Sequence, residues 1–366
     1  MLSYLAYKSM KNLFKISVYN FFVLFFIYLF LFSTNEVYAN TYKIENVEIS
    51  DEYNTNFNKD SVIDKAFINA YEILINKITL SKDQKLLKGQ NLKLVKSFVE
   101  SFSIINEKFE NNKYYGTFEI NFNKKRILSF LRNKNVFHSR MIVKDILFIP
   151  VYINLEEDSL LLFNENPFYK NWNYEKENFY LLNYILQSED LDDYKLIKDR
   201  IAFIENYDFN EIISKYEINE NFIIFIIIQD KDSFKTFSKF NVNKIRSNFK
   251  LEFEKFSFDE EDKIKQLIKL MKIRYDDEWK EINLINSSIK LNIQLNVNSK
   301  DIIFVEKIEK ILNEIELIEK YMISFFNSEM IRYNVLSNST PDKLIKEFNK
   351  YNIKVTIENN IWTLYE

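Results

Sequence analysis

The chain of 366 residues contains no cysteine, and this absence removes several kinds of chemistry at once. Without thiols there is no disulfide, no lipoprotein acylation site, no thiol nucleophile and no cysteine-based metal centre. A chain of this length can still fold stably, because its core is large enough to do so without cross-links.

Histidine, glycine and proline are almost as scarce, at one, two and three residues. Gly89 and Gly116 stand alone, which excludes a glycine-rich phosphate-binding loop. Turns must therefore use Asn, Asp and Ser, which tolerate left-handed backbone. General base catalysis usually needs an imidazole, and His138 is the only one. We expect His138 in an exposed linker, because nothing near it in sequence completes a catalytic triad.

Neither sign of charge dominates, since 50 basic residues face 53 acidic ones. No basic stripe indicates a nucleic-acid partner, and no acidic tail indicates a disordered arm. The strong bias toward Asn, Lys, Ile, Phe and Tyr is typical of an AT-rich genome and carries no functional information.

The first forty residues have the order of a secretory signal. Lys8, Lys11 and Lys15 form a positive segment, an apolar segment is densest over 21–32, and Val37-Tyr38-Ala39 supplies a cleavage site. We expect residues 1–39 to be a Sec-type signal peptide and the mature protein to lie in the periplasm or outside the cell. The segment 1–39 has three Lys and one Glu, so the mature chain carries a formal charge of −5.

The alternative is an uncleaved anchor, which would be the only contact with a membrane. A bilayer span needs about 20 apolar residues. Extension of the apolar segment back to Ile16 gives 17 residues and includes Ser17 and Asn20. This length favours cleavage.

Residues 40–140 are predicted to form an N-terminal α+β domain of order β-α-(α)-β-β-α. A strand is expected over 42–49, a helix capped by Asp60 or Ser61, a short helix over 92–102 and a last helix over 124–132. A hairpin should turn at Asn111-Asn112. The inward face of its second strand would carry Tyr114, Gly116, Phe118, Ile120 and Phe122.

Residues 141–257 are predicted to form a small α/β domain. The runs 146–153 and 222–228 are apolar throughout, as expected for strands covered on both faces in a parallel sheet. Between them we expect a strand over 181–186 and a helix whose apolar face runs from Tyr194 to Ile204. A hairpin over 235–256 should follow.

Residues 258–366 are predicted to form a C-terminal ferredoxin-like unit of order β-α-β-β-α-β. After a helix over 259–279, a strand alternates over 289–297 and a long helix runs over 299–318. Thr340-Pro341 should begin a further helix, as N-cap and first helical residue. Two short strands end the chain, with Trp362 and Leu364 on one face.

The acidic run 189–193 (EDLDD) is the best candidate for chemistry, since it follows a predicted strand, where α/β sheets place ligand sites. Asp190 and Asp193 are three residues apart and would share one helix face, so their oxygens suit Mg²⁺ or Ca²⁺. The competing interpretation is a helix start capped by Ser188, with carboxylates at the positive end of the dipole.

We favour the helix start, because no second group of ligands is evident in the sequence. Leu191, Tyr194 and Ile197 should then face the sheet, while Asp192 and Asp193 face water. On this interpretation the chain needs no metal and no other cofactor.

The segment 164–174 (NENPFYKNWNY) places four aromatic residues behind a proline. Asn166 should be extended because it precedes Pro167. Phe168, Tyr169 and Trp172 would stack on a sugar, peptide or partner if the segment is exposed. In a chain that is 17% aromatic, the preferred expectation is that the rings pack against the α/β layer.

Several of these motifs together resemble a known family. They are the strand LFIPVYIN with Pro150, Asn166-Pro167 with Trp172, the acidic run 189–193, Lys215-Tyr216, and the end of the chain with Trp362. The chain resembles the uncharacterised proteobacterial envelope proteins of domain of unknown function two-thousand-sixty-six. Phe168 stands where a family-like tryptophan is expected, and Ser188 or Glu189 where a glycine is usual. The resemblance implies an envelope location and the overall plan, and it brings no activity.

We therefore expect an exported, non-enzymatic envelope protein that binds another envelope protein or a cell-wall component. Two other functions stay open. One is a divalent-metal-dependent periplasmic hydrolase that uses the 189–193 cluster, and calorimetry with divalent ions would reveal it. The other is a periplasmic ligand carrier built around Phe168 to Trp172, which would retain its ligand through purification.

Cleavage of the signal is the first testable prediction. Protein from the envelope fraction should begin at Asn40, because signal peptidase cuts after the small residue Ala39. N-terminal sequencing checks this. A mature start at Met1, with the protein held in the inner membrane, would instead show an anchor.

Overall fold

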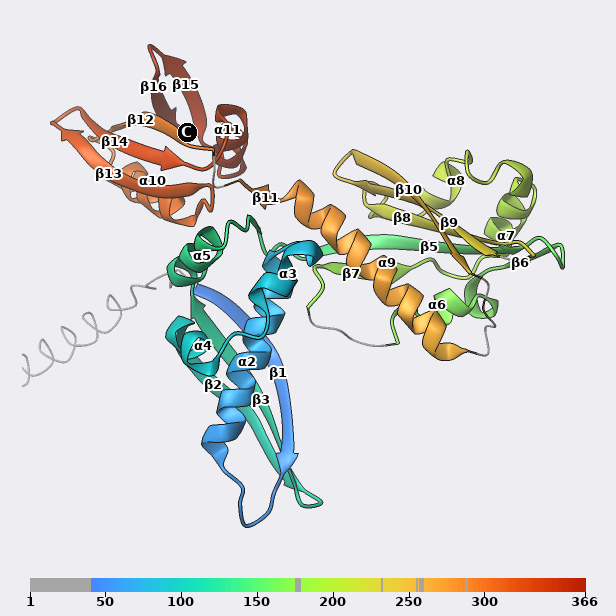
Figure 1. The fold of residues 1–366 in the computed structure, drawn as a ribbon. Coiled ribbons are helices and arrows are strands. Elements are labelled where there is room, and N and C mark those ends of the chain that lie inside the picture. Colours follow the sequence, from blue (N-terminus) through green and yellow to red (C-terminus); the bar gives the residue numbers. More distant parts are fainter. Residues whose placement is uncertain (1–40, 175–178, 232, 255, 257–259, 287–288) are drawn as a thin grey trace, which may run out of the picture. The chain divides into compact units, whose positions relative to one another are not determined.

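A computed structural model describes residues 41–174, 179–231, 233–254, 256, 260–286 and 289–366 (Figure 1). The predicted signal peptide lies outside these described residues. Three main sheets follow one another along the chain, each with a hydrophobic core. The expected mixture of α+β and α/β architecture is confirmed. Among the described helices, none is long and apolar enough to span a membrane.

The first sheet has the strand order β1-β3-β2, and its helices cover one face (Figure 1). The expected elements are all present, with one further helix, α3, which begins without a side-chain cap and so lacks a start signal in the sequence. The long helix α2 is capped by Asn58 rather than Asp60 or Ser61. The elements are β1 (Thr41–Glu52), α2 (Lys59–Ile78), α3 (Ser81–Leu87), α4 (Leu92–Phe98), β2 (Val99–Glu110), β3 (Lys113–Asn123) and α5 (Lys124–Asn133).

The imperfect alternation of β1 has a local cause. Asn46 has a φ of 54°, in the left-handed region that Asn tolerates. Tyr42 and Ile44 before it are buried, and so are Val47 and Ile49 after it. In a regular strand, even-numbered and odd-numbered residues face opposite sides of the sheet. The extra residue at Asn46 shifts this alternation by one, so the apolar residues before and after it face the same core.

The hairpin between β2 and β3 turns at Asn111-Asn112, as expected. Both residues have positive φ, 51° and 59°, the conformation of a type I′ turn. The predicted inward face of β3 is confirmed, since alternate residues from Tyr114 to Phe122 are buried. Gly116 allows this packing: an added Cβ would lie 2.7 Å from the Tyr114 hydroxyl and 2.8 Å from the Phe118 ring.

The middle sheet has the order β10-β9-β8-β5-β6, and β7 also pairs with β5. β5 is parallel to β8 and β7, and β9 and β10 form the expected antiparallel hairpin. The strands are β5 (Lys144–Asn154), β6 (Ser159–Leu161), β7 (Leu182–Leu186), β8 (Phe222–Gln229), β9 (Ser233–Val242) and β10 (Ile245–Glu254).

Helices cover both faces of this sheet, which explains the continuous apolar runs of β5 and β8. One face packs against α6 (Pro167–Trp172) and α9 (Glu261–Ile282), and the other against α7 (Leu191–Lys198), η2 (Ile201–Phe203) and α8 (Asn210–Ile213). α9 was expected in the C-terminal unit, but its buried side belongs to the core of the middle sheet.

Pro150 lies at the one place in β5 where a missing N–H does least harm. Along one edge, β5 pairs with β7 up to Phe148 and with β6 from Tyr152 onward. The main-chain groups of Lys144 and Phe148 make hydrogen bonds on the β7 side of β5. Every second residue of a strand directs its main-chain groups to the same side, so those of Pro150 point to the gap between β7 and β6. The Asn166 side-chain amide fills this gap and donates to the Pro150 carbonyl at 3.1 Å.

The C-terminal sheet has the order β13-β14-β12-β16-β15. Its first three strands follow the expected ferredoxin-like pattern, with α10 and α11 on the same face. The end of the chain differs from the predicted order. The strand that follows α11, β15, does not pair with β12; it forms a hairpin with β16, and β16 pairs with β12 in parallel. The elements are β12 (Leu291–Asn298), α10 (Ile302–Glu314), β13 (Ile318–Phe326), β14 (Met330–Ser337), α11 (Pro341–Lys350), β15 (Lys354–Glu358) and β16 (Ile361–Tyr365).

The two faces of β3 should differ sharply in their response to truncation. Phe118 is fully buried, and Phe118→Ala should lower the free energy of unfolding by about 3–5 kcal/mol through a lost core side chain. Glu119 faces outward and pairs with Lys43 at 2.9 Å, so Glu119→Ala should cost less than about 1 kcal/mol. Thermal melts of both variants test this, and equal shifts would contradict the assigned faces.

Candidate functional site

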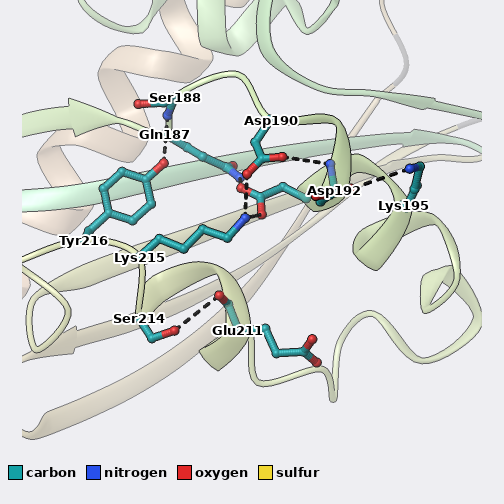
Figure 2. A network of polar contacts seen from close by, with 10 residues as sticks. Gln187, Ser188, Asp190, Asp192, Lys195, Glu211, Ser214, Lys215 and Tyr216 are labelled. Carbon is teal, nitrogen blue, oxygen red and sulfur yellow. Dashed lines mark hydrogen bonds and ion pairs between the residues drawn. The ribbon is translucent and has the colours of Figure 1, made fainter.

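A network of polar side chains joins the segment after β7 to the segment before β8 (Figure 2). Gln187 and Ser188 follow the last residue of β7, and Asp190 and Asp193 lie at the start of α7. Lys215 comes from the turn after α8. The acidic run thus meets a lysine that is 22 residues further along the chain.

Asp193 is the centre of this network. Its carboxylate is fully buried and accepts from Gln187 Nε2 at 2.7 Å and from Lys215 Nζ at 2.5 Å. Lys215 also donates to Asp190 Oδ2 at 2.6 Å, so one ammonium bridges two carboxylates (Figure 2). Such charge-assisted hydrogen bonds are among the stronger ones in proteins.

The electrostatics favour the charged forms of Asp190 and Lys215. The hydrogen bond from Lys215 is the largest influence on Asp190 and lowers the pKa of that carboxyl. Hydrogen bonds to Asp190 and Asp193 raise the pKa of Lys215. Lys215 is therefore held charged, which is the opposite of what a lysine acting as a base requires.

The start of α7 differs from the sequence prediction. Asp190, not Ser188, is the N-cap, and its side chain accepts from the N–H of Asp192 at 2.8 Å. The Ser188 N–H instead donates to the Tyr216 hydroxyl at 2.8 Å. The helix therefore begins two residues later than expected, and its buried face is rotated relative to the expected one.

This rotation corrects two expected orientations. Asp193 was expected to face water and is buried, whereas Leu191 was expected to face the sheet and is 80% exposed. Ile197 does lie in the core, and Tyr194 packs against it. Asp192 is exposed as expected, with Lys195 at 3.5 Å.

The aromatic segment is mostly packed inside the protein. Phe168 and Trp172 are fully buried, and the Trp172 ring stacks on Phe148 of β5 at 3.9 Å between centroids. Asn166 is extended, as expected before Pro167, and its side chain caps α6 through the N–H of Phe168. These two rings are core residues and present no surface for a ligand.

Tyr169 connects the aromatic segment to the polar network. Its hydroxyl donates to the Gln187 carbonyl at 2.8 Å, and burial raises the pKa of the phenol. Asn164 also contacts Glu189 through a side-chain hydrogen bond. Of the five residues proposed from sequence, Tyr169, Asp190 and Asp193 are thus joined through Gln187 and Lys215, whereas Phe168 and Trp172 pack against the opposite face of the sheet.

His138 is not the exposed linker residue that the sequence suggested. It lies in β4 (His138–Ser139), which pairs with β11 (Leu284–Ile285), and it is only 7% exposed. Burial lowers the pKa of the imidazole to about 4, and its Nε2 has no hydrogen-bond partner among the described residues. The charge of Glu316 acts on this ring, but among the described residues no nucleophile or acid is seen hydrogen-bonded to its Nε2.

The network joins two loops through a lysine ammonium. Its single ammonium already occupies the position between Asp190 and Asp193 that a metal ion would take. Within the described residues, no group of three or more His, Asp or Glu side chains is arranged to hold a metal ion. Gln187 and Lys215 were not among the proposed site residues, although the pair Lys215-Tyr216 was noted as a motif.

Removal of Asp193 should therefore be the most costly change in this network. Asp193→Ala leaves the buried Gln187 amide unpaired and should lower the free energy of unfolding by about 1–3 kcal/mol. Asp190→Ala removes the helix cap and should cost less than Asp193→Ala. Ser188→Ala should stay within about 0.5 kcal/mol, because its hydroxyl makes no hydrogen bond within the described part of the chain.

Urea denaturation of the three variants gives this ranking directly. If Ser188→Ala were the most damaging, Ser188 would be the cap after all. Melting with and without millimolar Ca²⁺ or Mg²⁺ tests the metal hypothesis. A rise in melting temperature with added ion, lost in Asp193→Asn, would favour metal binding over the lysine bridge.

Comparison with known proteins adds nothing to this picture: no family model matches the chain, and no curated protein matches it in sequence. The function must therefore be argued from the contacts themselves. They describe an ion-paired network in which the one ammonium of Lys215 contacts the two carboxylates of Asp190 and Asp193.

Proposed function

We propose that this chain is an exported, non-enzymatic protein that works by binding another component of the cell envelope. The N-terminal pattern of a secretory signal supports the location. The resemblance to the envelope family named above supports it further. The paired state of the acidic run and the buried, neutral His138 favour binding over catalysis.

The observation that carries the proposal is the uncovered edge of the first sheet. β2 is twelve residues long and lies at the end of the order β1-β3-β2. Most of its residues are exposed, including three large apolar ones, Phe102, Ile105 and Phe109. Exposed apolar residues alternate here with charged ones such as Glu107 and Lys108, and the main-chain groups of an edge strand can pair with a further strand.

Such an edge suits an extended segment of a second protein. Strand addition gains affinity from main-chain hydrogen bonds and specificity from alternate side chains. β2 carries two register shifts, one of them between Ile104 and Asn106, which places Ile105 at a bulge and leaves it 62% exposed. Ile105 would therefore be an apolar contact at the centre of an added strand.

Site-specific photo-cross-linking in the envelope tests the proposal. A photoreactive residue at Ile105 should give a discrete adduct, whose protein partner is then purified and titrated against the mature chain. Ile105→Asp should weaken that complex at least tenfold, since it places an unpaired charge in an apolar contact.

Ile303 provides the matched control, because it is an isoleucine that is 81% exposed on α10. Neither the cross-linker nor aspartate at Ile303 should reproduce the effects at Ile105. Identical adducts from both positions would contradict binding at β2. A purified chain that hydrolyses cell-wall material would contradict the non-enzymatic part of the proposal.

A further inference from the structure

The open face of the C-terminal sheet carries an unusual row of amide side chains. In β12 (LNIQLNVN), the residues Ile293, Leu295 and Val297 are buried against α10 and α11. The alternate positions point to the other face, which no described helix covers. Those positions are Asn292, Gln294, Asn296 and Asn298, all of them carboxamides.

This composition departs from the outward faces of the other sheets. The exposed positions of β1 include Lys43, Glu45 and Glu48, as expected in a chain that is 28% charged. Asn is disfavoured in strands, because its short polar side chain packs poorly against neighbours on a pleated surface. The outward face of β12 therefore presents four carboxamides and no charge, and what these groups can bind depends on their surroundings.

Strand pairing surrounds this row with complementary groups. Opposite Gln294 lies Asn334 of β14, and opposite Asn334 lies Met322 of β13. Opposite Asn296 lies Arg332, followed by Phe325. A depression of about 400 Å³ lies over this part of the sheet, lined by Asn292, Ile293, Gln294, Lys320, Met322, Asn334, Val335 and Leu336.

The hydrogen-bonding capacity of this face is largely unused. Asn296 accepts from Arg332 Nε at 2.9 Å, which fixes the guanidinium over the sheet. The side chains of Asn292, Gln294 and Asn334 make no hydrogen bond within the described part of the chain and are exposed. Each carboxamide offers two donors and an acceptor.

These groups define the chemistry of an occupant. An apolar partner would bury the amides without hydrogen bonds, which costs free energy for each group. A partner rich in hydroxyl and amide groups would satisfy them instead. The charges on this face are Lys320 and Arg332, with Lys354 and Glu358 on the outer strand, so it carries a net positive charge and suits an anion.

We infer that this face binds an oligosaccharide that carries N-acetyl and carboxylate groups. The carboxamides of β12 and β14 bond its hydroxyl and acetamido groups, and Arg332 and Lys320 pair with its carboxylates. Phe325, which is 45% exposed, and Met322 offer an apolar surface to the sugar rings. Neighbouring strands lie about 4.8 Å apart, close to the length of one sugar unit, so adjacent rows can contact successive sugars.

This inference adds a second partner to the proposed function and rests on a different surface. Export and strand addition at β2 are tested in cells, with the cross-linker at Ile105. Glycan binding is measured on the purified mature chain, so either proposal can fail alone.

Titration calorimetry with three hexasaccharides of known structure tests the inference. The probes are hyaluronan, which alternates N-acetyl and carboxylate sugars, the N-acetylglucosamine oligomer, and cellohexaose, which has neither group. Hyaluronan should bind most tightly and lose affinity as salt is raised, because Arg332 and Lys320 are near the surface. The N-acetylglucosamine oligomer should bind more weakly, and cellohexaose most weakly of all.

Variants place the site on this face. Gln294→Ala and Asn334→Ala should each weaken binding about tenfold through lost hydrogen bonds, and Arg332→Gln should remove the preference for hyaluronan. Asn349→Ala on α11 is the matched control and should change nothing, while unchanged melting temperatures show that the variants fold. Absence of binding to all three probes, equal affinity in the variants, or tighter binding to an oligothymidylate would overturn the inference.

Discussion

Burial of β5 on both faces is the constraint on which the middle of the protein depends. In a strand covered on both sides, every side chain must be apolar or have its polar groups hydrogen-bonded to a neighbour. Nine successive residues of β5, from Ile146 to Asn154, are buried. Its main-chain groups also have to be satisfied where its partner changes from β7 to β6. Pro150 has no N–H to satisfy at that point, and Asn166 takes its carbonyl.

This arrangement explains why the noted motifs lie together. Asn166 bonds Pro150 with its amide nitrogen and caps α6 with its oxygen, so α6 is fixed against the sheet. Trp172, at the end of that helix, then stacks on Phe148. The hydroxyl of Tyr169 reaches the Gln187 carbonyl on the far side of the gap. Motifs that are separate in the sequence are therefore joined by contacts around β5 and α6.

The polar network and the two proposed binding surfaces differ in one physical respect. In the network, Lys215 pairs with both Asp190 and Asp193, so these three groups already have partners inside the protein. On β2 and on the open face of β12, main-chain groups and carboxamides remain available. Both proposed binding surfaces therefore lie on a sheet edge or face, outside the acidic run 189–193.

Most elements and their buried faces could be predicted from residue pattern, because periodicity is a local property. β3, β5, β8 and the Asn111-Asn112 turn are examples. Features that depend on distant partners could not be predicted in this way. Asp193 turns inward because Lys215 and Gln187 receive it, and His138 is buried because β11 pairs with it. The place of β16 beside β12 was likewise set by strand pairing, since a hairpin reverses chain direction without leaving a trace in local alternation.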